Sequence, residues 1–309
     1  MTILAPHHLV PLLIVGEADQ DVPSGSLRVH SVDGVGKEAQ RLVNLGLLSC
    51  KLYVRTPNHL KNERATAGLE EDSLMVRAIS SIKDAAPTMR VGTEVCACAY
   101  HSAGECVLLS GSGIDDAATH DLVSRMAVLH ADAGADVVVA GLTHGDSIRA
   151  IRAALDDAGH GNVDVMGSLQ LRSGFYAPYR KLMGTEPEAG ETFRSHLPPE
   201  QVDVVLAKAK ELIEEGATSL SIQPALVGMS IVPQLRRSVD VPLAAYSVST
   251  ELNLVRGDGP DLWLASGREA ILAEYFSALI NAGADQVQTY VAGDLASWLI
   301  GQTRDAATV

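Results

Sequence analysis

Apolar runs alternate with amphipathic segments along the whole chain. Runs rich in Val, Ile and Leu are typical of buried strands, and the longer segments between them have the periodicity of helices. Strands are predicted at residues 8–16, 47–54, 89–98, 136–141, 163–168, 220–223, 242–248 and 285–290. Helices are predicted at 36–44, 72–85, 119–133, 147–158, 201–215 and 268–282, with another ending near 238.

Repeated strand–helix units predict a parallel sheet. Three of the helices lead into their strand through a Gly-Ala step, at Gly134, Gly216 and Gly283. A (β/α)8 TIM barrel is the most economical architecture, and we expect one domain over residues 1–309 with a short N-terminal arm, 1–8. An open doubly wound sheet is the alternative, but no strand–Gly-x-Gly-x-x-Gly–helix unit marks a dinucleotide site.

Composition narrows the class of protein. The chain has 309 residues, 47% of them hydrophobic, and a formal net charge of −14. The acidic balance argues against a nucleic-acid partner, because phosphate binding needs a basic surface. No apolar run is long enough to span a membrane, and the first residues do not resemble a signal peptide. Four cysteines do not make a disulfide framework, so we expect a soluble cytoplasmic protein.

Three of the cysteines are closely spaced. Cys96 and Cys98 are two residues apart at the end of a predicted strand, where alternate side chains point the same way. Cys106 follows after a loop that contains Gly104. Three thiolates suit Zn²⁺ and leave a fourth position for water or substrate. The alternative is that all three are ordinary reduced core cysteines.

In a barrel of this kind, the site lies at the carboxyl ends of the strands. The cysteines fall at such an end, and so do Gln170, Gln223, Ser249 and Tyr290. The predicted topology therefore gathers these residues around one mouth.

Several segments, in order, resemble the porphobilinogen synthase (5-aminolevulinate dehydratase) family. The stretch 94–106 resembles its D-V-C-x-C-x-Y…C zinc loop with identical cysteine spacing, and 175–180 resembles F-Y-G-P-F-R. The stretch 246–251 resembles Y-x-V-S-G-E, and 282–290 resembles A-G-A-D…T-Y. The resemblance implies a barrel fold and a condensation of two 5-aminolevulinate molecules, assisted by zinc on Cys96, Cys98 and Cys106.

The family uses two lysines that form Schiff bases with the substrate ketones, and both positions differ here. Aligned on the motifs, they fall on Gln170 and Gln223. An amide nitrogen is not a nucleophilic amine and cannot form an imine. The two glutamines could instead hydrogen-bond a substrate carbonyl or carboxylate, or simply fill space.

The resemblance also implies a set of binding residues. Arg180 matches the arginine that holds a substrate carboxylate, a task suited to a guanidinium. Tyr246 and Ser249 match other carboxylate-holding positions, and Tyr176 and Tyr290 are weaker candidates. The alternatives are a surface arginine and ordinary packing residues. Glu94 takes the place of the family's aspartate before the zinc cysteines, and we assign it a catalytic role.

Lys51 lies inside an apolar strand, where a lysine is rarely buried without a partner. It could serve as a replacement amine or pair with a carboxylate. His101, Glu105 and His144 are possible acid–base groups, each of which could equally be a loop residue. Cys50 is predicted to be a core thiol, and Lys181 is a second lysine near the motif.

These observations favour a zinc-dependent lyase that acts on a small carboxylate-bearing keto or amino acid without lysine imines. A catalytically inactive homologue that binds a ligand or partner is the first alternative. Residual porphobilinogen synthase activity through another lysine is the second. We expect no membrane partner and a homo-oligomer, as a dimer.

Overall fold

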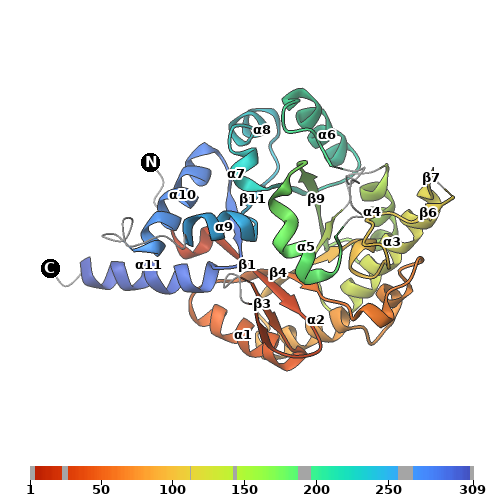
Figure 1. The fold of residues 1–309 in the computed structure, drawn as a ribbon, viewed down its shortest axis with the longest axis horizontal. Coiled ribbons are helices and arrows are strands. Elements are labelled where there is room, and N and C mark those ends of the chain that lie inside the picture. Colours follow the sequence, from red (N-terminus) through yellow and green to blue (C-terminus); the bar gives the residue numbers. More distant parts are fainter. Residues whose placement is uncertain are drawn as a thin grey trace.

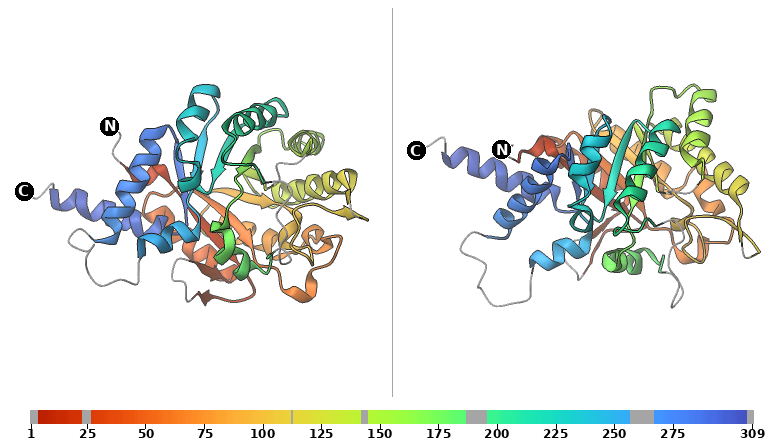
Figure 2. Two further views of the ribbon diagram at one scale, coloured as in Figure 1. Left: turned by 45° about the horizontal axis from the view of Figure 1, so that its top comes forward. Right: turned by 90° about the horizontal axis from the view of Figure 1, so that it is seen from above.

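The computed structural model describes residues 4–22, 27–111, 113–141, 145–186, 196–256 and 267–306. Within these residues, eight parallel strands close into a barrel that helices surround (Figure 1). The predicted TIM barrel is therefore confirmed. Both termini lie on the same side of the molecule, beside the last two helices (Figure 2).

The barrel strands follow one another around the barrel in chain order. They are β1 (Leu9–Val15), β4 (Ser49–Val54), β5 (Arg90–Val95), β8 (Val137–Ala140), β9 (Asp164–Gln170), β10 (Ser219–Gln223), β11 (Leu243–Tyr246) and β12 (Gln286–Thr289). The first and last strands pair in parallel, with Leu9 opposite Val287, and this pairing closes the sheet. Two short strands, β2 (Gln20–Asp21) and β3 (Arg28–His30), extend the sheet beside β1.

Helices surround the barrel, and most of them pack apolar side chains against the outside of the sheet. They are α1 (Val32–Asn44), α2 (Leu74–Ala85), α3 (Asp116–Asp132), α4 (Ser147–Asp157), α5 (Ala177–Met183), α6 (Val202–Glu214), α7 (Ala225–Gly228), α8 (Val232–Ser238), α9 (Ser249–Arg256), α10 (Arg268–Ala282) and α11 (Ala292–Ala306). None of the helices that the structure describes is long and apolar enough to cross a membrane.

Alternation along each strand separates the helix-facing core from the barrel interior. In β4, Cys50, Leu52 and Val54 belong to the core that the helices cover. Lys51 and Tyr53 lie on the opposite face of the same strand, inside the barrel. Although β4 is buried almost throughout, this alternation places its polar side chains in the interior of the barrel.

The predicted Gly-Ala junctions have a physical cause. Gly134, Gly216 and Gly283 have φ values of 103°, 114° and 116° at the points where helices end. Other residues are strained in this left-handed region, so glycine is favoured there. In each case the strand begins three residues after the glycine, at Val137, Ser219 and Gln286.

The structure also corrects several predicted boundaries. The cysteine strand ends at Val95, and Cys98 lies in a 3-10 turn, η4 (Ala97–Ala99), so strand alternation does not align Cys96 with Cys98. The segment 169–199 was predicted as a loop but contains α5, and a predicted loop before Gly36 contains β3 and the start of α1. Pro178 near the start of α5 is compatible with a helix because its first turn needs no N–H donor.

One buried histidine lies between α3 and β5. The Nδ1 atom of His130 is 3.0 Å from the Thr93 hydroxyl, and burial lowers the pKa of His130 from 6.5 to about 4. The ring is therefore neutral in the folded protein at neutral pH. The unfolded chain takes up this proton at a higher pH than the folded chain does.

This shift predicts a pH-dependent loss of stability. As pH falls from 6.5 to 4, the native protein should lose up to about 3 kcal/mol of unfolding free energy at this site. His130→Gln should lack this part of the loss, because an amide does not titrate. Urea unfolding of both proteins at several pH values measures the difference. Equal pH dependence of the two proteins would contradict the prediction.

Candidate functional site

A pocket opens at the carboxyl ends of the barrel strands. Helix α5 supplies part of its wall through Tyr179 and Arg180. Nine of the eleven residues predicted for the site line this one pocket: Glu94, Cys96, Cys98, Cys106, Gln170, Tyr176, Arg180, Gln223 and Tyr246.

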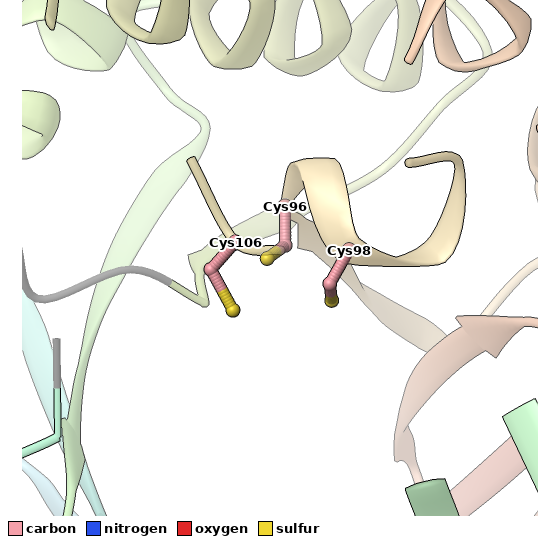
Figure 3. A group of neighbouring side chains, drawn as sticks. All are labelled: Cys96, Cys98 and Cys106. Carbon is pink, nitrogen blue, oxygen red and sulfur yellow. The ribbon is translucent and has the colours of Figure 1, made fainter. Parts of the chain in front are cut away.

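Three thiols meet at one side of the pocket. The sulfur atoms of Cys96, Cys98 and Cys106 all lie within 4.8 Å of one another. Figure 3 shows them converging on the same space from the end of a strand, a helical turn and the returning loop. The cysteines are thus brought together as predicted, although a turn and not a continued strand aligns the first two.

The loop that returns Cys106 depends on Gly104. Its φ is +68°, and a Cβ added there would lie 2.7 Å from the Cα of Thr185. Only glycine fits this close backbone approach without displacing the chain. At Gly104 the cysteine loop therefore packs directly against the backbone of the segment that follows α5.

The protonation of the thiols is uneven. Hydrogen bonds from Cys106 and Cys96 hold the pKa of Cys98 well below its usual value, and the nearby positive charges of Arg180 and Lys61 add to this. Hydrogen bonds with Cys106 and Cys98, together with burial, raise the pKa of Cys96. At Cys106 the bond with Cys96 lowers the pKa, but the bond with Cys98 and burial outweigh it, so the net direction is upward. Because thiolates are the form that binds metals, this donor set fits zinc.

Gln170 and Gln223 end neighbouring strands on the same wall. Residue 170 pairs with 223 in the parallel register of β9 and β10. The Gln170 amide donates a 2.7 Å hydrogen bond to the carbonyl of Gly141. The Tyr176 hydroxyl donates a 2.8 Å hydrogen bond to the backbone carbonyl of Gln223. Both glutamine side chains are nearly buried.

Lys51 and Glu94 form an ion pair at the base of the pocket. The Lys51 Nζ atom is 2.9 Å from Glu94 Oε2, although the alignment falls short of a regular hydrogen bond. The ammonium also lies 4.9 Å and 5.4 Å from the ring centroids of Tyr53 and Tyr246. Burial raises the pKa of Glu94, and the charge of Lys51 opposes this effect.

Gly141 makes room for the Glu94 carboxylate. A Cβ at position 141 would lie 2.0 Å from Glu94 Oε1 and 3.1 Å from the Cβ of Cys96. The carboxylate therefore occupies the space that a side chain at 141 would fill. Glu94 is consequently held between an ammonium on one side and a backbone on the other.

Arg180 is the cation on the opposite part of the wall. Its guanidinium lies 5.0 Å from the Tyr176 ring centroid, and one of its amino groups is 3.2 Å from His196 Nε2. Burial, with the charge of Arg180, lowers the pKa of His196 to about 3. His196 is thus neutral and accepts the arginine hydrogen bond. Burial also lowers the pKa of Arg180 itself, but a guanidinium remains charged at neutral pH.

Two predicted site residues lie outside the pocket wall. Ser249 is fully buried at the start of α9. Tyr290 reaches the wall indirectly, through a 2.7 Å hydrogen bond between its hydroxyl and that of Tyr246. Neither lines the pocket among the described residues.

The remaining candidates are scattered. His101 accepts a hydrogen bond from the backbone N–H of Ala103 within its own loop. His144 lies outside the described residues, and Glu105 is partly buried away from the pocket lining. Lys181 is exposed and lines a separate hollow. The Cys50 prediction is confirmed, because the thiol is buried in the core and burial raises its pKa to about 12.

Sequence reasoning missed part of the aromatic wall. Tyr53, Tyr179 and His196 also line the pocket. Tyr53 could have been found, since it lies two residues after Lys51 on the same strand face. Burial raises the pKa of Tyr53, Tyr179 and Tyr246 well above the usual value, so these phenols are neutral.

The amino-acid sequence is similar to the sequences of one known enzyme family. The family model for delta-aminolevulinic acid dehydratase matches residues 2–298. The delta-aminolevulinic acid dehydratase of Methanothermobacter thermautotrophicus is 33% identical over 276 residues, covering 89% of this chain and 82% of that protein. The Bacillus subtilis enzyme is 30% identical, covering 94% of this chain and 90% of that protein.

A solved structure supports the fold. The porphobilinogen synthase of Toxoplasma gondii ME49, crystallised with the product porphobilinogen, superposes with a TM-score of 0.91 and 24% identity. The match covers 96% of this chain and 86% of that chain. The chain belongs to the delta-aminolevulinic acid dehydratase (porphobilinogen synthase) family, whose members are lyases.

Proposed function

We propose that this protein is a zinc-dependent lyase that condenses or dehydrates a small carboxylate-bearing substrate without a lysine imine at positions 170 and 223. The observation that carries the proposal is the juxtaposition of three converging thiols and two strand-end glutamines in one pocket. In this proposal the three cysteines keep the family's metal-binding role, and amides stand at the two positions that align with its amines.

The pocket residues have distinct parts in this proposal. Cys96, Cys98 and Cys106 would hold the zinc ion, which supplies a Lewis acid that polarises a carbonyl or lowers the pKa of bound water or amine. Arg180 binds the substrate carboxylate, because a guanidinium matches its two oxygens. The neutral tyrosine rings exclude water around it, which strengthens that attraction.

The two glutamines orient the substrate. Gln170 is already held by its bond to Gly141, so its carbonyl oxygen remains the group that can accept a hydrogen bond from a ligand. Gln223 lines the same wall one strand further on. Hydrogen bonding to polar substrate atoms replaces covalent attachment at these two positions.

Ordinary porphobilinogen synthase activity is the second candidate. Family membership over nearly the whole chain favours it. It would need an amine at the pocket, and Lys51, which contacts the wall residue Glu94, is a candidate. Lys51 is only 2% exposed and is already paired, which argues against its attack on a ketone.

Zinc content tests the metal assignment. The purified native protein should hold about one zinc ion per chain, and Cys98→Ala should lose most of it because only two thiolates remain. Cys50→Ala is the matched control and should keep its zinc, since that thiol lies in the helix-facing core. Atomic absorption on the three proteins measures this, together with their thermal unfolding. Native protein without zinc, or equal zinc in Cys98→Ala, would contradict the assignment.

Reductive trapping tests the absence of an imine. With 5-aminolevulinate and borohydride, the native protein should form no covalent adduct, because the pocket amides cannot form an imine. Gln223→Lys should form an adduct at position 223, which mass spectrometry of peptides would locate. Gln40→Lys on exposed α1 is the control and should not react. An adduct of the native protein at Lys51 would overturn the proposal in favour of the second candidate.

A further inference from the structure

The pocket wall carries two opposite side-chain charges besides the thiols. Among the described residues that line it, Glu94 is the carboxylate and Arg180 is the guanidinium. A pocket with one cation and one available anion would suit a zwitterion such as an amino-keto acid. A ligand ammonium could bind there only if the Glu94 carboxylate were free to accept it.

Lys51 already neutralises that carboxylate from inside the barrel. Its Nζ atom is 2.9 Å from Glu94 Oε2, and the lysine side chain is only 2% exposed. The faces of Tyr53 and Tyr246 lie 4.9 Å and 5.4 Å from the ammonium. The positive charge is thus fixed beneath the pocket and remains there without a ligand.

The other oxygen of Glu94 is also enclosed. Glu94 Oε1 packs against the backbone of Gly141, so closely that a Cβ there would lie 2.0 Å away. The Glu94 side chain is 15% exposed, and a substrate ammonium would have to approach it beside an ammonium that is already bound. Two like charges near each other in a partly buried site repel, and each also loses its hydration.

We propose that Lys51 is a specificity-determining residue, which takes the place of a substrate ammonium and selects carboxylates that carry a ketone but no amino group. The inference rests on the proposed function only for the location of the substrate pocket. The remaining ligand-directed charge is then Arg180, which suits a keto carboxylate with a single negative charge. The substrate class would differ in this respect from the amino-keto acid that names the family.

Levulinate and 5-aminolevulinate are a matched pair of probes, because they differ only by the ammonium group. Native protein should bind levulinate at least as tightly as 5-aminolevulinate in calorimetric titrations at pH 7. Lys51→Met should reverse the preference by about tenfold, since it leaves Glu94 without its internal cation. Lys51→Arg keeps the charge and should keep the native preference.

Two further variants separate charge from folding. Lys51→Met combined with Glu94→Gln removes both charges, so it should bind the two probes with similar affinity. Lys83→Met removes another ion-paired lysine, 2.5 Å from Asp136 on the outside of the barrel, and should leave the preference unchanged. Thermal unfolding checks that each variant is folded.

The native preference decides the matter even if Lys51→Met does not fold. Tighter binding of 5-aminolevulinate than of levulinate by the native protein would overturn the inference, and so would failure to bind either probe. An unchanged ratio in a folded Lys51→Met would also overturn it. These titrations need no turnover, so an absence of zinc would reject the proposed metal chemistry without affecting the ligand preference.

Discussion

The pairing of β1 with β12 is the constraint on which the site depends. It closes the parallel sheet, with Leu9 opposite Val287, and so directs the carboxyl ends of all eight strands toward one mouth. Residues that are far apart in the sequence meet there only because the sheet is closed. Without closure, the cysteine loop after β5 and the glutamines of β9 and β10 would lie along an edge and would not enclose a pocket.

Charged side chains set the electrostatic potential of the pocket at two depths. At the mouth, Arg180 lies among neutral tyrosines and a neutral histidine, so a bound carboxylate meets one dominant cation. One layer deeper, Lys51 and Glu94 are paired away from water. A buried pair of this kind gives little net stability, but removing one partner is costly because the other charge is left alone. We therefore interpret the Lys51–Glu94 pair as determining the charge that the pocket presents to a ligand.

Much of the fold could be predicted from the sequence because it follows from local patterns. The apolar runs located all eight strands, and the Gly-Ala steps marked helix ends where a positive φ is required. The spacing of Cys96, Cys98 and Cys106 also predicted their meeting. Helix α5 was missed because it is only seven residues long and has a proline in its first turn, and it is held by tertiary contacts with α9.

The pairwise partners in the pocket could not be predicted in the same way. The sequence showed Lys51 only as a lysine within an apolar strand. Its partner Glu94 lies on the neighbouring strand, two residues beyond Gly92, which is the register partner of Lys51. The pocket contacts of His196 depend on where Arg180 projects from α5. Ser249 and Tyr290 follow the predicted strand ends but miss the pocket wall, because the chain turns into α9 and α11 at these points. Such contacts depend on side-chain directions that a linear pattern does not contain.

The proposed function depends on three thiolates that hold a catalytic zinc ion with one position left for a ligand. X-ray absorption at the zinc edge of the purified protein tests it most directly, because it counts sulfur and lighter neighbours separately. We expect three sulfur atoms at about 2.3 Å and one oxygen or nitrogen neighbour, with the lighter neighbour changing when a keto carboxylate binds. Four sulfur neighbours, or a spectrum unchanged in Cys98→Ala, would contradict it.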